Sequence, residues 1–369
     1  MADLLRPVSN RRIERDSEFM KRFFLKLSST AALAAAGGGL ASALLSLLTV
    51  QKTTLALAMG CLSPLPIMLA TLAFGAWPGW AAAVIATSTV FAFGAGQGGF
   101  AASHWELLQP AALDAASYAI SLAIPAWWLS RLAASTRLSA PTIAAADERK
   151  LGLIIASAAA FSVLGIVIDF TSTVIAQGGF TATMATMAEH VEPYVQTLLE
   201  GRDLPTGLTA HDVAVAMTWA EMPVLAAASL VLLGFNMWLA ARITRASGRF
   251  PAPWPDLPHN LRAPRVLGLV LAVALGLSFA GGLVGMIALI ATGALSMAFA
   301  VQGIALIHDV TRGKSYRLPL LIILYLTLGM LMPWLLAVYA AIGLGDAGFS
   351  WRGKPVRAPE PGKTRPTNS

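Results

Sequence analysis

Long, almost uncharged apolar segments recur along the whole chain and predict helices that span a membrane. Val213–Ala241 and Leu318–Ile342 both exceed the roughly 20 residues that a helix needs to cross about 30 Å of hydrocarbon. The run from Val266 to Ile307 is long enough for two crossings, with Gly281-Gly282 and Gly285 as the predicted turn. The pattern therefore predicts an all-α, polytopic transmembrane helix bundle of about eight or nine spans. The candidate spans are Ala31–Val50, Thr54–Phe74, Trp77–Phe93, Ala112–Leu129, Leu151–Ile175, Val213–Ala241, Val266–Ala280, Leu283–Ile307 and Leu318–Ile342.

The amino-acid composition agrees with this assignment and argues against several classes of function. Charged residues make up 12% of the chain, about half the usual share in a globular protein. The net charge is +7, but the basic residues gather at the ends of apolar segments, where they set orientation and meet anionic lipid. We therefore expect the lipid bilayer, and no nucleic acid, as the partner of these charges. The one cysteine, Cys61, excludes an internal disulfide and a cysteine-based metal site.

The loops between the segments predict which side of the membrane each one faces. Three loops are rich in Lys and Arg, and by the positive-inside rule they face the cytoplasm together with the basic N-terminal segment, residues 1–30. We expect a multi-pass protein of the inner (plasma) membrane with a cytoplasmic N-terminus, a transmembrane domain over residues 31–343 and a polar, basic tail over residues 344–369. The basic loop residues are Arg131, Arg137, Arg149, Lys150, Arg242, Arg245, Arg249, Arg262, Arg265, Arg312, Lys314 and Arg317.

The C-terminal tail conflicts with that topology. Nine spans would place it outside the cell, yet it is rich in basic residues. Either a terminal tail escapes the positive-inside rule or one of the predicted spans is wrong, and the pattern leaves both open. The basic residues of the tail are Arg352, Lys354, Arg357, Lys363 and Arg365.

The loop over residues 177–212 is acidic and is predicted to lie outside. Within it Phe180, Met184 and Met187 recur at helical spacing, with Glu189 on the other side. This spacing predicts an amphipathic helix at the membrane interface. It is interpreted either as a connector resting on the lipid headgroups or as a lid over an external pocket.

Three carboxylates inside apolar segments are the main candidates for binding chemistry, because an ionisable group in a membrane is costly. Under the topology above, Asp114, Asp169 and Glu221 all fall in the outer third of the bilayer. One hypothesis is that they line an external pocket for a cation or the amine of a solute, and the other is that they reach the headgroup region. Gln302 and Asn236 are further polar candidates within the spans.

Two prolines interrupt the second span. Pro64 and Pro66 remove two backbone donors, so the helix is expected to kink or break at membrane depth. A broken helix can present backbone groups to a bound solute, and a purely structural kink is the other interpretation.

The first span is dense in small residues. Ala31, Ala35 and Gly39 follow one another at intervals of four, a spacing that lets helix backbones approach closely. It predicts either a contact within the protein or docking against a partner membrane protein.

No residue pattern predicts catalysis. The 5 histidines are scattered, none forms a pair with metal-ligand spacing, and the chain has no Walker-type phosphate loop. We therefore expect no metal, no cofactor and no enzymatic activity.

Three passages carry a family resemblance. They are Leu62-Ser63-Pro64-Leu65-Pro66, Ile124-Pro125-Ala126-Trp127-Trp128, and Gly343-Leu344-Gly345-Asp346 followed by Phe349, Trp351 and Arg352. Together they resemble the YybS-like family of bacterial integral membrane proteins. That family is thought to be related to the substrate-binding S components of energy-coupling-factor vitamin transporters, and more loosely to the rod-shape protein MreD. The resemblance implies a helical solute-binding unit that docks through its first helix, although this chain has more spans than S components usually have.

Two functions follow as hypotheses. The first is a transport-associated small-solute-binding protein, with Asp114, Asp169 and Glu221 around an external pocket and Pro64 and Pro66 shaping a broken helix. The alternative is a non-transporting scaffold of cell-envelope assembly that acts through helix–helix contacts. The first predicts that the carboxylates converge, and the second that they face the lipid headgroups.

Overall fold

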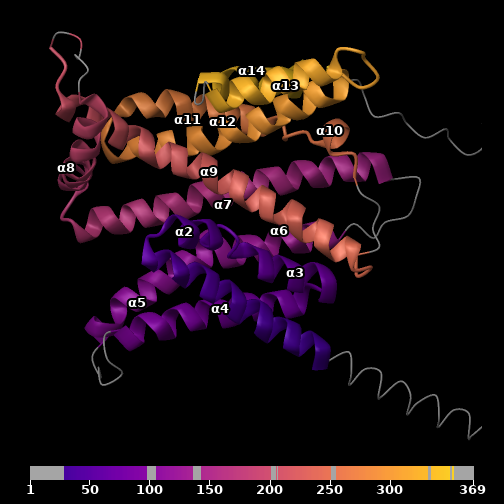
Figure 1. The fold of residues 1–369 in the computed structure, drawn as a ribbon, viewed down its shortest axis with the longest axis horizontal. Helices are drawn as coiled ribbons and strands as arrows, with labels where there is room; N and C mark the ends of the chain where they lie inside the picture. Colours follow the sequence, from indigo (N-terminus) through magenta and orange to yellow (C-terminus); the bar gives the residue numbers. More distant parts are fainter. Residues whose placement is uncertain are drawn as a thin grey trace, which may run out of the picture. The chain divides into compact units, whose positions relative to one another are not determined.

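The all-α prediction is confirmed by a computed structural model, in which the described residues form helices joined by turns (Figure 1). The structure describes residues 29–97, 105–135, 143–200, 205, 207–250, 255–330, 334–349 and 351–352. Two compact units divide the chain: a first unit of Met1–Ala134 with Asn236–Pro251, and a second unit of Ser135–Phe235 with Ala252–Ser369. The helices long and apolar enough to cross a membrane are Ser29–Gln51, Thr54–Phe74, Ala76–Gly96, Glu148–Ala176, Ala210–Ala246 and Gly282–Val310.

The first unit packs its helices through small residues. At Gly39 in the first helix, an added Cβ would lie 2.6 Å from the carbonyl oxygen of Ala82 in α4, so the two backbones are almost in contact. The predicted fourth span is not one straight α-helix, because a π-helical turn separates α5 from α6. The elements of this unit are Ser29–Gln51 ending in η1 (Thr49–Gln51), α2 (Thr54–Gly60), α3 (Pro64–Phe74), α4 (Ala76–Gln97), α5 (Trp105–Tyr118), η2 (Ala119–Ala123), α6 (Ile124–Ala134) and the end of α9 (Ala210–Ala246).

The second span breaks where the prolines predict. Helix α2 ends at Gly60 and α3 begins at Pro64, with a short turn between them. Hydrogen bonds over three residues carry the chain through this turn, from Ser63 N to Gly60 O (2.9 Å) and from Leu65 N to Leu62 O (3.0 Å). At the break, hydrogen bonds over three residues thus replace the α-helical hydrogen bonds over four residues, and the turn is tighter.

Side chains of the first unit bind the carbonyl groups at this break. Asn236 Nδ2 donates to Cys61 O at 2.8 Å, and Ser42 Oγ donates to Ser63 O. Ser63 Oγ donates in return to Ser42 O at 3.0 Å, while the hydroxyls of Ser42 and Tyr118 lie 2.7 Å apart. Because a bare carbonyl is expensive in hydrocarbon, these bonds stabilise the broken helix without any bound solute.

In the second unit, α12 is the central helix. It contacts α7, α8, α10, α11 and α14, and several of its large side chains are fully buried, among them Phe299, Ile290 and Gln302. The predicted turn before it is present, since Gly281 and Gly282 have φ angles of 68° and 55° that favour glycine. The elements are α7 (Ile143–Ala176), α8 (Phe180–Leu199), the first part of α9, α10 (Leu257–Asn260), α11 (Val266–Leu277), η4 (Ser278–Ala280), α12 (Gly282–Val310), α13 (Arg317–Met330) and α14 (Trp334–Phe349).

The prediction that Leu318–Ile342 forms a single helix is wrong. The structure has two helices there, α13 and α14, and α14 continues to Phe349. The two differ in environment: α14 packs on α12, whereas Leu324 is the one buried residue of α13. Apolar composition alone runs through both helices and does not reveal the division.

Two glycines bring α12 and α14 together. An added Cβ at Gly343 would lie 1.9 Å from Phe299 O, and one at Gly303 would lie 2.1 Å from Tyr339 O. Any larger residue must push the helices apart, which costs dispersion contacts along their whole interface.

We expect Gly343→Ala to lower the free energy of unfolding by about 1–3 kcal/mol through overpacking. Gly329→Ala in α13 is the matched control, because its added Cβ meets no atom within 4 Å, and it should be neutral or stabilising by about 1 kcal/mol. Thermal unfolding of the detergent-purified protein, followed by circular dichroism, measures both. Equal stability of the two variants would contradict the close contact.

Candidate functional site

The second unit buries an arginine just beyond its last helix. The Arg352 side chain is 0% exposed, and its guanidinium donates to Asp346 Oδ2 at 2.6 Å. It also donates to the carbonyl oxygens of Pro258 (2.5 Å) and Leu261 (2.9 Å), in and after the short helix α10. Arginine suits this position because its planar, always charged group donates in several directions at once.

Gln302 joins this pair to the centre of the unit. Its Nε2 donates to Asp346 Oδ2 and its Oε1 accepts from the backbone N–H of Ala263, both at 2.8 Å. Gln302 is fully buried in α12. We call Gln302, Asp346 and Arg352 the C-terminal clamp, because they bind α12, the end of α14 and the segment around α10 to one another.

The residues around the clamp fit closely. At Gly345 an added Cβ would lie 2.5 Å from the ring of Trp351, and that ring stacks on Phe349 with centroids 6.2 Å apart. Gly345 thus leaves room for the Trp351 ring beside the clamp.

A second, more exposed ionic network lies beside the clamp. Arg312 forms an ion pair with Asp256, and His259 Nδ1 lies 2.9 Å from Asp309 Oδ2. The hydrogen bond from Arg312 holds the pKa of Asp256 below its ordinary value. The stabilising effect of this pair is therefore present at neutral pH and is lost as the pH falls through that lowered pKa.

The clamp shows which basic loop the start of the C-terminal tail contacts. Arg352 lies against the segment that leads to Arg262 and Arg265, one of the three basic loops. We call this the basic end of the second unit, and the tail starts there. The division of the last predicted span into α13 and α14 is compatible with a tail that starts at the basic end, and the side of the membrane that the tail faces stays a prediction.

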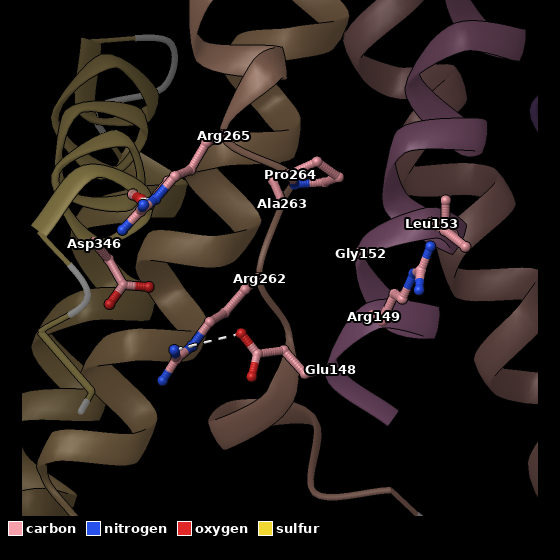
Figure 2. Close-up of a pocket in the computed structure, with 10 residues that line it drawn as sticks. Glu148, Arg149, Gly152, Leu153, Arg262, Ala263, Pro264, Arg265 and Asp346 are labelled. Carbon is pink, nitrogen blue, oxygen red and sulfur yellow. Dashed lines mark hydrogen bonds and ion pairs between the residues drawn. The ribbon is translucent and has the colours of Figure 1, made fainter. Parts of the chain in front are cut away.

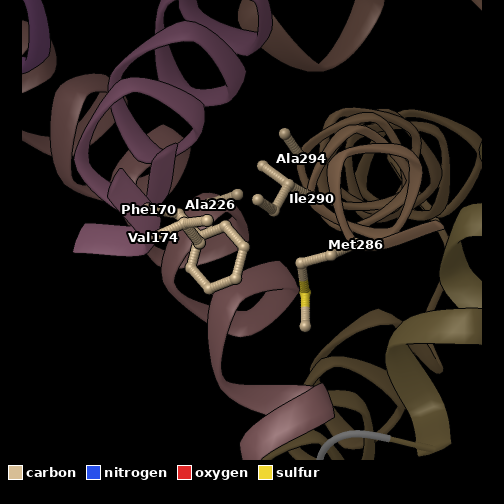
Figure 3. Close-up of a cluster of buried hydrophobic side chains, with 6 residues drawn as sticks. All are labelled: Phe170, Val174, Ala226, Met286, Ile290 and Ala294. Atoms are coloured by element: carbon tan, nitrogen blue, oxygen red, sulfur yellow. The ribbon is translucent and has the colours of Figure 1, made fainter. Parts of the chain in front are cut away.

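At the opposite end of the unit, α8 covers an apolar cluster. On α7, Arg149 at the basic end is separated from Phe170 by roughly 30 Å, close to the thickness of a bilayer's hydrocarbon core. Here helices α7, α9 and α12 meet in a buried cluster (Figure 3). Its members are Phe170, Val174, Ala226, Met286, Ile290 and Ala294.

The apolar face predicted for α8 packs on this cluster. Phe180, Met184 and Met187 contact it, and the Phe180 ring lies 5.6 Å from that of Trp219 in an edge-on arrangement. Further along α8, Tyr194 is 73% exposed. The first half of α8 therefore packs on the protein as a cap, and its role as a lid over a pocket stays a prediction.

Two of the three predicted carboxylates are neighbours in sequence of residues in or against this cluster. Asp169 is half-buried and adjacent to Phe170, and Glu221 is exposed between Trp219 and Met222, which pack on the cluster. Asp114 is exposed on α5 and belongs to the first unit. Sequence position thus gave Asp169 and Glu221 a common level on neighbouring helices, and their role in binding stays a prediction.

The other predicted site residues lie in the first unit. Pro64 is the first residue of α3 and Pro66 follows in its first turn. Ala35 and Gly39 are buried, with Gly39 against α4, and Ala31 is half-buried. This is the contact within the protein that one of the two interpretations expected, and docking of a partner through these residues stays a prediction.

A pocket of about 540 Å³ opens at the basic end (Figure 2). It lies between the start of α7, the segment before α11 and the end of α14. Its lining residues are Glu148, Arg149, Gly152, Leu153, Arg262, Ala263, Pro264, Arg265, Asp346 and Ala347. In the sequence, these arginines indicate only the orientation of the protein. A glutamine within an apolar segment (Gln302), and an aspartate and an arginine close together near the end of the last one (Asp346 and Arg352), are the signals in the sequence of a buried polar centre.

A family model described as "Predicted membrane protein (DUF2232)" matches residues 142–347, more than half of the chain. The chain belongs to this family. The DUF2232 match begins at the start of α7 and ends in α14, so it contains Gln302 and Asp346 of the clamp as well as Asp169 and Glu221. No curated protein and no solved structure matches the chain. Membership establishes a membrane protein and assigns no activity to it.

We expect Arg352→Gln to lower the free energy of unfolding by about 3–5 kcal/mol, because it leaves Asp346 charged and buried. Arg312→Gln is the matched control: its ion pair with Asp256 has both side chains 41% exposed, and its loss should cost about 1 kcal/mol or less. Thermal unfolding compares them. The double variant Arg352→Met, Asp346→Leu should regain most of the free energy of unfolding that Arg352→Gln loses, because it leaves no buried charge unpaired. If it does not, the clamp stabilises the protein through packing rather than through charge.

Cysteine labelling tests the side of the tail. In a Cys61→Ala background, Lys314→Cys and Gly348→Cys should react with an impermeant maleimide from the same side of sealed vesicles, because both positions lie at the basic end. Glu189→Cys on α8 should react from the opposite side. If Gly348→Cys reacts from the same side as Glu189→Cys, the tail does not start at the basic end.

Proposed function

We propose that this DUF2232 protein is a transport-associated membrane protein that binds a small cationic solute beneath α8. The observation that supports this most is the packing of α8 as a cap over a cluster with a carboxylate on each of two neighbouring helices. A capped, mostly apolar site with a few polar groups is the usual form of a small-molecule site.

The side chains beneath the cap suit such a ligand. Asp169 and Glu221 supply negative charge, and Phe180 and Trp219 offer ring faces that attract cations. Met184, Met187, Met222 and Met286 are flexible and can repack around a bound molecule without a new fold. The cap can therefore open and close by rearranging methionine contacts.

Orientation and resemblance agree with this proposal. The positive-inside rule would place the basic end in the cytoplasm and α8 outside, where a solute is captured before transport. The likeness to the YybS-like family implies the same kind of activity, since that family is thought to be related to the S components of vitamin transporters. The loose relation to MreD instead suggests a scaffold of envelope assembly. The ligand assay described next distinguishes the two functions.

We expect a library of amines and metal cations, added to the detergent-purified protein, to contain a ligand that raises its unfolding temperature. At 100 times its dissociation constant such a ligand adds about 2.7 kcal/mol of stability. Glu221→Gln and Asp169→Asn should remove the effect, because each deletes a charge beneath α8. Glu189→Gln, an exposed carboxylate on α8 itself, is the matched control and should keep it.

The same assay tests the role of Asp114 and the alternative function as a scaffold. Asp114→Asn shows whether the carboxylate of the first unit also takes part. A well-folded protein that no member of the library stabilises would contradict the solute-binding proposal. Capture of an envelope-assembly protein through Ala31, Ala35 and Gly39 would then favour the scaffold.

A further inference from the structure

The pocket at the basic end carries more positive than negative groups. Three guanidinium groups line it, from Arg149, Arg262 and Arg265, against the carboxylates of Glu148 and Asp346. Asp346 is already paired with Arg352 within the clamp, at 2.6 Å. The net field in the pocket therefore favours an anion.

The arginines come from two different elements and line the same pocket. Arg262 and Arg265 belong to the segment before α11 and extend toward Asp346, whereas Arg149 lies on the α7 side of the pocket, next to Leu153 (Figure 2). Arg265 Nε donates to Ala347 O at 2.9 Å, which fixes its stem against the end of α14. Groups held in place from several sides can bind a tetrahedral anion with little loss of conformational freedom.

One ion pair in the pocket is loose enough to yield to a ligand. Arg262 Nη1 and Glu148 Oε1 lie 3.4 Å apart, whereas a strong charge-assisted hydrogen bond measures about 2.7–2.9 Å. A phosphate oxygen placed beside Arg262 would form a shorter bond than Glu148 does. The Arg262 side chain is only 12% exposed, so such a bond would be shielded from water.

The shape and surroundings of the pocket fit a headgroup at a membrane surface. Its volume of about 540 Å³ lies within the usual range for small-molecule sites. Beside the arginines stand Leu153, which is 46% exposed, and Pro264, so charged and apolar surfaces adjoin. Basic pockets between membrane helices, at their cytoplasmic ends, are known to receive phosphate headgroups.

The backbone geometry maintains the pocket. An added Cβ at Gly152 would lie 2.7 Å from Arg262 O, so α7 and the segment before α11 are almost in contact at this point. The clamp holds the same segment from the other side, through the bond of Arg352 to Leu261 O. The segment that carries Arg262 and Arg265 is thereby held close to α7.

We propose that this pocket binds a phosphate group, supplied by an anionic phospholipid headgroup or by a soluble phosphate ester. Arginine recognises phosphate oxygens in pairs, which a single lysine cannot do. This site is separate from the one proposed beneath α8, since it lies at the other end of α7.

Two measurements with the full-length protein test the proposal and separate the two sources. Native mass spectrometry of the protein in nanodiscs counts phosphatidylglycerol retained from mixtures with phosphatidylcholine. Thermal unfolding in detergent measures stabilisation by glycerol 3-phosphate and by inorganic phosphate. In both, the variant is Arg149→Gln, and its matched control is Arg245→Gln, an exposed arginine outside the pocket.

We expect Arg149→Gln to weaken binding roughly tenfold, because it removes one charge-assisted contact, while the ligand-free unfolding temperature stays unchanged since Arg149 is exposed. Arg149→Lys, which keeps the charge but loses the paired geometry, should bind at an intermediate level. An effect of Arg149 on phosphatidylglycerol alone supports the lipid source, and an effect on the soluble phosphates supports the ester. If Arg149→Gln and Arg245→Gln behave alike in both measurements, the proposal is wrong.

Discussion

The second unit depends on a buried charge pair. Asp346 and Arg352 are both shielded from water, and removing either one would leave the other charged in a medium that cannot solvate it. Gln302 and the carbonyl oxygens around α10 satisfy further polar groups of the pair. Because these partners come from α12, α14 and the segment before α11, the pair fixes three parts of the chain relative to one another, and with them the start of the tail.

The length of α7 gives the second unit two chemically different ends. One end holds the arginines of the pocket, and the other holds the methionine-rich cluster beneath α8. A helix that crosses the hydrocarbon core separates the two by about 30 Å. The two proposed ligands, a cation at one end and a phosphate at the other, match the charges found there and do not compete for one site.

The first unit shows how a membrane protein tolerates a broken helix. Pro64 and Pro66 disturb the bonding of the second span, and the carbonyl groups at the break are bound by Asn236 and Ser42. Those carbonyls are therefore already occupied by the protein's own donors. These hydrogen bonds account for the break as a structural feature, and a role of Pro64 and Pro66 in binding a solute stays a prediction.

The sequence by itself determined the class of protein, most of its helices and the amphipathic character of α8. These follow from local chemistry: apolar length fixes a span, a proline fixes a break, and a spacing of three or four residues fixes a helical face. Only the tertiary structure decided that Leu318–Ile342 divides into α13 and α14, because apolar composition continues through both and Pro333 predicts a kink in one helix as readily as a division into two. It also decided that Gln302 meets the Asp346–Arg352 pair, and that Glu148 pairs with Arg262. Such contacts join residues far apart in the chain, and they arise from helix packing that no local pattern contains.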